Sequence, residues 1–289
     1  MVENKDGEIE IKWLDQNELH CGTLTQGSSI YPNIFLAVVK DENGAEQDIG
    51  YYIDEFGNAY NTRNGNIIDG RLGNQTVDAE TEVLFILKES GSSELLADMF
   101  WFRDVVLAQD PQKGNNLKKR EKRAITRYCN VLSGILGLLD GFPSFKDCAY
   151  INLNKIGGGS EQTKSYPQLV KAQASVIQKQ IGLLHPKRIV CMGSYGMVTK
   201  EYKTDENKFS LLDLCCGEKT VSPKNDGNHM MWSKNGYNMV KVKGEGWLPV
   251  YDCWHPAYGG SYDKLADGRT RKHILQEYYE WRVKETSSK

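Results

Sequence analysis

The sequence predicts an α/β protein: a three-layer α/β/α sandwich around a four-stranded, mainly parallel sheet, with a small antiparallel β appendage at the N-terminus. Two observations predict this class. From Thr81 onward, short apolar runs alternate with amphipathic helical patterns, which is typical of a parallel sheet covered by helices. Before that point, strand-like segments are separated by turn signals. We therefore expect a β-rich appendage over residues 1–78 and an α/β domain over 79–289, with an insertion at 200–245.

The appendage is predicted from short apolar segments that are joined by tight-turn dipeptides. Asn-Gly is the strongest short signal for a hairpin, and it occurs at 43–44 and 64–65, with Phe-Gly-Asn at 56–58. The expected strands are 34–40 and 49–53, with shorter ones around 59–60 and 67–68. We expect them to cover an edge or a face of the main domain.

The main domain is predicted to begin with a strand at 83–87, because this run is apolar throughout and suits a strand buried on both faces. Ser92 or Ser93 can cap a following helix over 94–109. A second helical pattern runs through Leu139, with an apolar stripe formed by Ile125, Tyr128, Leu132, Ile135 and Leu139. The remaining expected elements are a strand at 148–153, a helix from Ser165 to before Pro186, strands at 188–192 and 247–254, and a closing helix from Asp267 or Thr270 to Lys284. Pro249 argues that the last strand lies at an edge or starts late.

Charge is distributed unevenly, although the net charge is only −2. Residues 1–60 carry twelve Asp and Glu against three Lys and Arg, whereas 112–127 carry seven Lys and Arg and one Glu. Such a basic run is either a solvated helix face or a contact for nucleic acid. The DNA-contact hypothesis uses its five clustered cations, Lys118, Lys119, Arg120, Lys122 and Arg123.

Composition argues against several classes. No apolar run approaches the roughly 20 residues that cross a membrane, and the polar start is unlike a signal peptide. The seven cysteines include no CxxC pair, which favours reduced thiols in the cytoplasm. We therefore expect no metal and no cofactor, with the possibility of Cys and His ligands from distant positions left open.

Polar side chains follow three of the predicted strands. Glu89 comes after the first, Asn152 and Asn154 lie at the end of the second, and His255 follows the last. Strand alternation is expected to put both asparagines on one face of the second strand. Because parallel strands end at one edge of a sheet, these groups are expected at one rim, where open α/β sheets bind ligands. The alternatives are a polar turn at Glu89, asparagines that satisfy backbone groups, and a strand-ending turn at His255.

The order of these segments resembles the uracil-DNA glycosylase superfamily from Thr81 to the C-terminus. The segments that carry the resemblance are VLFILKESG (83–91), YINLNK (150–155), LLHPKRIVCMGSYG (183–196) and WHPAY (254–258). The first is similar to the family's water-handling motif, the second to the strand that reads the flipped base, and the last to the closing His-Pro-Ser motif.

The resemblance implies a role for each matching residue. Glu89 would activate or position water, and His255 would stabilise the leaving base. Asn152, or Asn154 as second choice, would read the base edge, with Lys88 and Gly91 beside the base. Tyr258 lies in the segment that the family uses to grip the DNA backbone.

The chain departs from the family pattern at informative positions. Leu87 and Ser90 stand where the first motif usually has glycine and proline, and Ala257 replaces the serine of the last motif. Gly91 stands where strict uracil enzymes have a tyrosine that blocks substituents on pyrimidine C5. Glycine leaves open the side of the pocket that faces C5, so the pocket is expected to admit a 5-substituted pyrimidine. The alternative is that the side chain of Tyr195 or Tyr258 closes this side.

The sequence therefore predicts a metal-independent, monofunctional DNA glycosylase that excises a non-canonical pyrimidine and leaves an abasic site, in repair or in antiviral defence. Such an enzyme flips the base out of the helix before it acts. Its partner is DNA, with no membrane and no obligate protein partner. Two other classes remain open: a catalytically inactive DNA-binding or inhibitory relative, and an N-glycosidase of free nucleosides or nucleotides.

Overall fold

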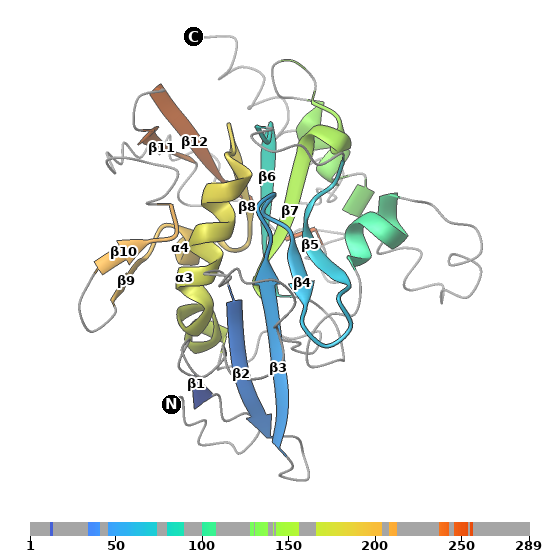
Figure 1. Cartoon of the computed structure of the whole chain (residues 1–289). Coiled ribbons are helices and arrows are strands. Elements are labelled where there is room, and N and C mark those ends of the chain that lie inside the picture. The colour runs from blue at the N-terminus through green and yellow to red at the C-terminus, as the bar shows by residue number, and fades with distance from the viewer. Residues whose placement is uncertain are drawn as a thin grey trace, which may run out of the picture.

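The computed structural model contains one ten-stranded sheet, with helical segments packed against it (Figure 1). The strands follow the order β1-β2-β3-β4-β5-β7-β6-β8-β12-β11 across the sheet. A separate hairpin is formed by β9 (Glu201–Lys203) and β10 (Lys208–Ser210). The described residues are 12–13, 34–40, 46–73, 80–89, 100–107, 128–129, 131–137, 141, 143–155, 166–203, 208–212, 237–242, 246–253 and 255–256.

The N-terminal strands form an antiparallel meander. They are β1 (Lys12–Trp13), β2 (Ile34–Lys40), β3 (Glu46–Ile53), β4 (Ala59–Asn61) and β5 (Ile67–Arg71). In the β3–β4 turn, Asp54 Oδ1 accepts hydrogen bonds from the backbone N–H groups of Phe56 and Asn58, at 2.9 and 2.8 Å. Gly65 takes φ +71° in the β4–β5 turn, a conformation that glycine adopts at little cost. The turns predicted at 56–58 and 64–65 are confirmed, and that at 43–44 lies outside the described residues.

Four neighbouring strands run parallel to one another. They are β7 (Cys148–Asn154), β6 (Val83–Glu89), β8 (Ile189–Met192) and β12 (Gly246–Cys253). The predicted strands at 83–87, 148–153 and 188–192 are confirmed. In β6, Phe85 pairs with Tyr150 on one side and Val190 on the other. This central position explains the uninterrupted apolar run, because helices or loops cover both faces of such a strand.

Both alternatives predicted from Pro249, an edge position and a late start of the last strand, are wrong, because β12 has a neighbour on each side and begins at Gly246. The strand β11 (Tyr237–Val242) pairs antiparallel with β12 on its outer side, and Met239 lies opposite Pro249. A proline removes one donor from the ladder but leaves the rest of the strand able to pair. The region 200–245 was expected to be irregular, yet within its described part β9, β10 and β11 are strands.

The helix α3 (Tyr166–Leu184) packs on one face of the sheet (Figure 1). Its start near Ser165 and its end before Pro186 are confirmed. A first core cluster forms beneath it, and its members on α3 include Val170, Ala174, Ile177, Ile181 and Leu184. The short helix α4 (Tyr195–Val198) follows β8 and adds Tyr195 and Val198 to the same cluster.

The opposite face of the sheet carries a second, aromatic core cluster. Phe102 stacks on Tyr150 of β7 with 4.5 Å between the ring centroids and 6° between the ring planes. The cluster also receives Val131, Leu132, Ile135 and Leu136 from a helical stretch at 131–136. Further helical segments on the described part of the chain are a π-helix at Phe102–Leu107 and a 3-10 helix at Phe145–Asp147. The predicted helix over 94–109 is described only at residues 100–107, where it is largely a π-helix.

The predicted fold class is wrong, because the parallel strands and the N-terminal strands belong to one mixed sheet. Strand β5 pairs antiparallel with β7, with Gly70 opposite Tyr150 and Arg71 opposite Ala149. An unpaired edge of β7 would expose a row of backbone donors and acceptors, and β5 covers part of it. The structure is therefore a ten-stranded mixed sheet and not a four-stranded α/β/α sandwich with a separate appendage. The domain division near residue 78 stays a prediction.

Candidate active site

The carboxyl ends of the parallel strands lie at one rim of the sheet. Strand β6 ends at Glu89, which is in register with Asn154 at the end of β7. On the other side, Met192 at the end of β8 is in register with Cys253 at the end of β12. The backbone N–H of Gly193 donates a 2.6 Å hydrogen bond to the Cys253 carbonyl and holds the last two strand ends together. The residues at the ends of these strands therefore lie along one rim, although more than 150 positions separate Glu89 from His255 in the chain.

The side chains of Lys88 and His255 both approach Gly193. It takes φ +74°, and a Cβ atom at this position would lie 3.2 Å from Lys88 Cε and 3.5 Å from His255 Cβ. The positive φ and the close approach both favour glycine over any residue with a side chain. The turn after β8 thus leaves room for a lysine from β6 and a histidine from beyond β12 at one place.

The His255 imidazole is half-buried and forms a hydrogen bond with a tyrosine. Its Nε2 lies 3.2 Å from the hydroxyl oxygen of Tyr128, and the two rings meet edge to face at 86° with centroids 5.7 Å apart. Burial, and secondly the positive charge of Lys88, lower the pKa of His255 from 6.5 to about 4. The imidazole is therefore neutral at neutral pH. A neutral imidazole beside an ammonium group can stabilise negative charge that develops on a bound group.

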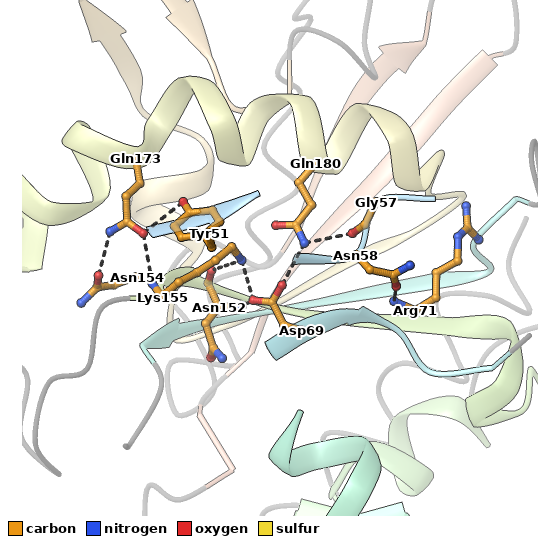
Figure 2. A network of polar contacts seen from close by, with 10 residues as sticks. All are labelled: Tyr51, Gly57, Asn58, Asp69, Arg71, Asn152, Asn154, Lys155, Gln173 and Gln180. Carbon is orange, nitrogen blue, oxygen red and sulfur yellow. Dashed lines mark hydrogen bonds and ion pairs between the residues drawn. The ribbon is translucent and has the colours of Figure 1, made fainter. Parts of the chain in front are cut away.

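Asn152 is held from one side by a buried ion pair (Figure 2). Its backbone N–H donates to Asp69 Oδ2 at 3.0 Å, and its carbonyl accepts from Lys155 Nζ at 3.0 Å. Asp69 and Lys155 pair with each other, and each is 1% exposed. Figure 2 shows the Asn152 side chain pointing away from α3, the side on which Gln173 and Gln180 lie. This direction leaves the amide on the sheet face that carries Tyr150 and the aromatic cluster.

Asn154 lies in different surroundings from Asn152. It is fully buried, and its Oδ1 accepts a 2.8 Å hydrogen bond from Gln173 Nε2 on α3. The strand alternation predicted that the two asparagines share a face, but the end of β7 turns Asn154 towards the helix (Figure 2). Of the two candidate base readers, Asn152 is the one whose side chain is directed away from this helix.

The ion pair belongs to a larger buried network between β3, β5, β7 and α3 (Figure 2). Gln180 Nε2 donates to Asp69 Oδ1 at 2.8 Å, and Gln173 Oε1 accepts from the Tyr51 hydroxyl at 3.1 Å and from the Lys155 backbone at 3.2 Å. Burial lowers the pKa of Lys155, although the carboxylate of Asp69 acts in the opposite direction. Burial, and secondly Asp69, raise the pKa of Tyr51.

Sequence reasoning missed this network and Tyr128. Two signals for the network were present: the lysine that directly follows the second strand, and two glutamines seven residues apart on the buried face of α3. Tyr128 was expected only as part of an apolar helix stripe. No local signal pairs Tyr128 with His255, because 127 positions separate them.

The remaining predicted site residues lie outside the described part of the chain. They are Gly91, Lys118, Lys119, Arg120, Lys122, Arg123 and Tyr258. The backbone of Glu89 lies at the rim, in register with Asn154. Among the described residues, no three His, Cys, Asp or Glu side chains gather as metal ligands would. Within the same residues, no helix is long and apolar enough to cross a membrane.

Comparison of the chain with protein-family models, with curated proteins and with solved structures finds no match.

Proposed function

We propose that this protein is a DNA glycosylase that hydrolytically releases a non-canonical pyrimidine and leaves an abasic site. The observation that carries the proposal is the meeting of Lys88 and a neutral His255 at Gly193, on the same rim where β6 ends in Glu89. A cation and an uncharged imidazole side by side suit a leaving group that departs with negative charge. The resemblance of four ordered sequence segments to the uracil-DNA glycosylase superfamily supports the same reaction.

The reaction that we propose balances with water as the only co-reactant. The oxygen of water attacks C1′ of the sugar, and the N-glycosidic bond breaks with its electron pair going to the base nitrogen. The carboxylate of Glu89 orients the water and accepts its proton. His255 donates a hydrogen bond to the carbonyl oxygen of the leaving base, and Lys88 offsets the negative charge. The Asn152 amide, with one acceptor and two donors, reads the base edge.

The proposed substrate is DNA that carries a 5-substituted pyrimidine. The resemblance aligns Gly91 with the tyrosine that blocks C5 substituents in strict uracil enzymes, so we expect a bulky group on pyrimidine C5 to be tolerated. The basic run over 112–127 supplies affinity for phosphates that does not depend on base sequence. A cytoplasmic enzyme of this kind would create abasic sites in foreign DNA that carries hypermodified cytosine and spare unmodified DNA. Defence against such DNA is therefore the role that we propose.

A base-release assay tests the proposal. The full chain is incubated with duplexes that contain uracil, 5-hydroxymethylcytosine or glucosylated 5-hydroxymethylcytosine, and free bases are measured by mass spectrometry together with abasic sites in the DNA. We expect release of at least one modified base, and binding that weakens steeply as salt rises. Tight binding to these duplexes without release of any base would instead show a catalytically inactive relative. Cleavage of free nucleosides with no action on DNA would show a nucleosidase.

A further inference from the structure

Tyr128 contacts the candidate catalytic histidine through its hydroxyl group. The oxygen lies 3.2 Å from His255 Nε2, within the range of a hydrogen bond. The nearly perpendicular rings bring the edge of one towards the face of the other, an arrangement that aromatic pairs favour. The contact therefore has defined geometry in both the polar and the aromatic parts of the two side chains.

The aromatic cluster fixes the Tyr128 ring. The indole of Trp101 meets it at 79° with 5.5 Å between centroids, and the Phe102 ring lies 6.5 Å away. Phe102 is itself buried and stacked on Tyr150 of β7. The position of the phenol is thus tied to the sheet that positions Asn152, two residues further along the same strand.

The direction of the hydrogen bond follows from the chemistry of the two groups. A neutral imidazole has one N–H donor and one nitrogen with a lone pair. That lone pair is a better acceptor than a phenol oxygen, and the phenol proton is a good donor. Since burial and the charge of Lys88 keep His255 neutral at neutral pH, the favoured arrangement has the Tyr128 hydroxyl donating to Nε2.

We infer that Tyr128 is a positioning residue that holds His255 as the tautomer with its proton on Nδ1. In this tautomer Nδ1 carries the proton and is the ring nitrogen that can donate to a bound acceptor. Its importance for base release rests on the proposed function, in which His255 donates to the oxygen of the leaving base. The tautomer itself can be measured whether or not the protein releases bases.

Nitrogen NMR of protein labelled with ¹⁵N-histidine tests the inference. The chain has five histidines, so His255→Gln identifies the signals of interest. We expect the wild-type spectrum at pH 7 to show a protonated Nδ1 and an unprotonated Nε2 for His255. A wild-type spectrum with the proton on Nε2 of His255 overturns the inference, and this result does not depend on any change at Tyr128.

Tyr128→Phe removes the hydroxyl and keeps the ring. In this variant we expect the His255 signals to move towards a mixture of tautomers or to the Nε2 form, and kcat for base release to fall about tenfold with little change in KM. The matched control is Tyr202→Phe, which removes a buried hydroxyl that donates to the Met197 carbonyl in the other core cluster. The control should leave the His255 signals and kcat unchanged.

The two hypotheses fail in different ways. If the wild type releases no base but the spectrum shows the Nδ1 tautomer and its loss in Tyr128→Phe, the proposed function is wrong and the positioning role stands. If bases are released but the tautomer is the same in wild type and Tyr128→Phe, the positioning role is wrong and the proposed function stands.

Discussion

Asp69 and Lys155 form a buried ion pair that holds the backbone of Asn152 at both of its polar groups. Strands β5 and β7 pair where Gly70 lies opposite Tyr150. Beyond this pair, the side chains of Asp69 and Lys155 bond to the Asn152 backbone in the place of a further strand residue. A candidate base-reading residue is thereby anchored by its main chain while its side chain is directed away from α3. This arrangement connects the antiparallel and parallel parts of the sheet at the rim of the site.

Removing one partner of this ion pair should destabilise the protein strongly. Lys155→Met leaves the Asp69 carboxylate buried without its cation, so we expect the free energy of unfolding to fall by about 3–5 kcal/mol. The double variant Asp69→Asn/Lys155→Met should lose less than the sum of the two single variants, because no unpaired charge remains. Urea denaturation followed by circular dichroism measures all three. Strict additivity would contradict a direct coupling between the two side chains.

His255 should titrate in the folded protein with a pKa of about 4. Because this value lies below the ordinary 6.5, the unfolded chain binds the proton more readily. The contribution of His255 to stability is therefore complete above about pH 6.5 and is lost as the pH falls towards 4. We expect Lys88→Met to raise the pKa of His255 but to leave it below 6.5, since burial is the larger cause.

An NMR titration of the His255 ring in wild type and Lys88→Met measures this shift. Lys187→Met is the matched control, because Lys187 pairs with Glu82 just before the start of β6 and at the opposite end of that strand from Lys88. A pKa of His255 that is the same in the wild type and in Lys88→Met would show that Lys88 does not act on the imidazole.

Gly193→Ala should disturb the site in two separable ways. The positive φ is strained for alanine by roughly 1–2 kcal/mol, and the added methyl group would press on Lys88 and His255. Gly65→Ala is the matched control, because Gly65 has φ +71° but no atom within 4 Å of its Cβ position. We expect both variants to lose similar backbone stability, measured by thermal unfolding, and only Gly193→Ala to shift the His255 NMR signals. Unshifted signals in Gly193→Ala would mean that the site has more room than the structure indicates.

Glu89→Gln should keep the fold and the binding of DNA but slow base release by about 10²- to 10⁴-fold, because the amide cannot accept the proton of water. Single-turnover release from a modified duplex measures the rate. Glu82→Gln, just before β6 starts, is the control and should retain activity. Near wild-type turnover in Glu89→Gln would identify Glu89 as a turn residue only.

Gly91→Tyr should restrict the substrate. A tyrosine in the place that strict uracil enzymes use to block C5 substituents is expected to abolish release of large 5-substituted bases and to leave any release of uracil intact. Gly91→Ala, with a much smaller side chain, should release both. Parallel loss of both activities in Gly91→Tyr, or efficient uracil release by the wild type with no release of a 5-modified base, would contradict an open pocket wall.

Local sequence patterns were sufficient for the elements that hold the site. The strand at 83–87 was recognised from its apolar run, and α3 from its stripe and from Pro186, because burial and backbone chemistry leave a periodic signal. The same patterns placed Lys88, Asn152 and His255 after or at the ends of strands. The meeting of Lys88 and His255 at Gly193 follows from parallel strands that end at one edge, and only the structure established it.

Only the tertiary structure decided how the strands associate and which polar groups face each other. The pairing of β5 with β7 joins segments about 80 positions apart, and nothing in either segment specifies that partner. The orientation of Asn154 towards Gln173, the ion pair of Asp69 with Lys155 and the bond of Tyr128 to His255 are contacts of the same long-range kind. A sequence determines locally which residues avoid water and where the chain turns, whereas the partner of a buried polar group depends on the packing of the whole sheet.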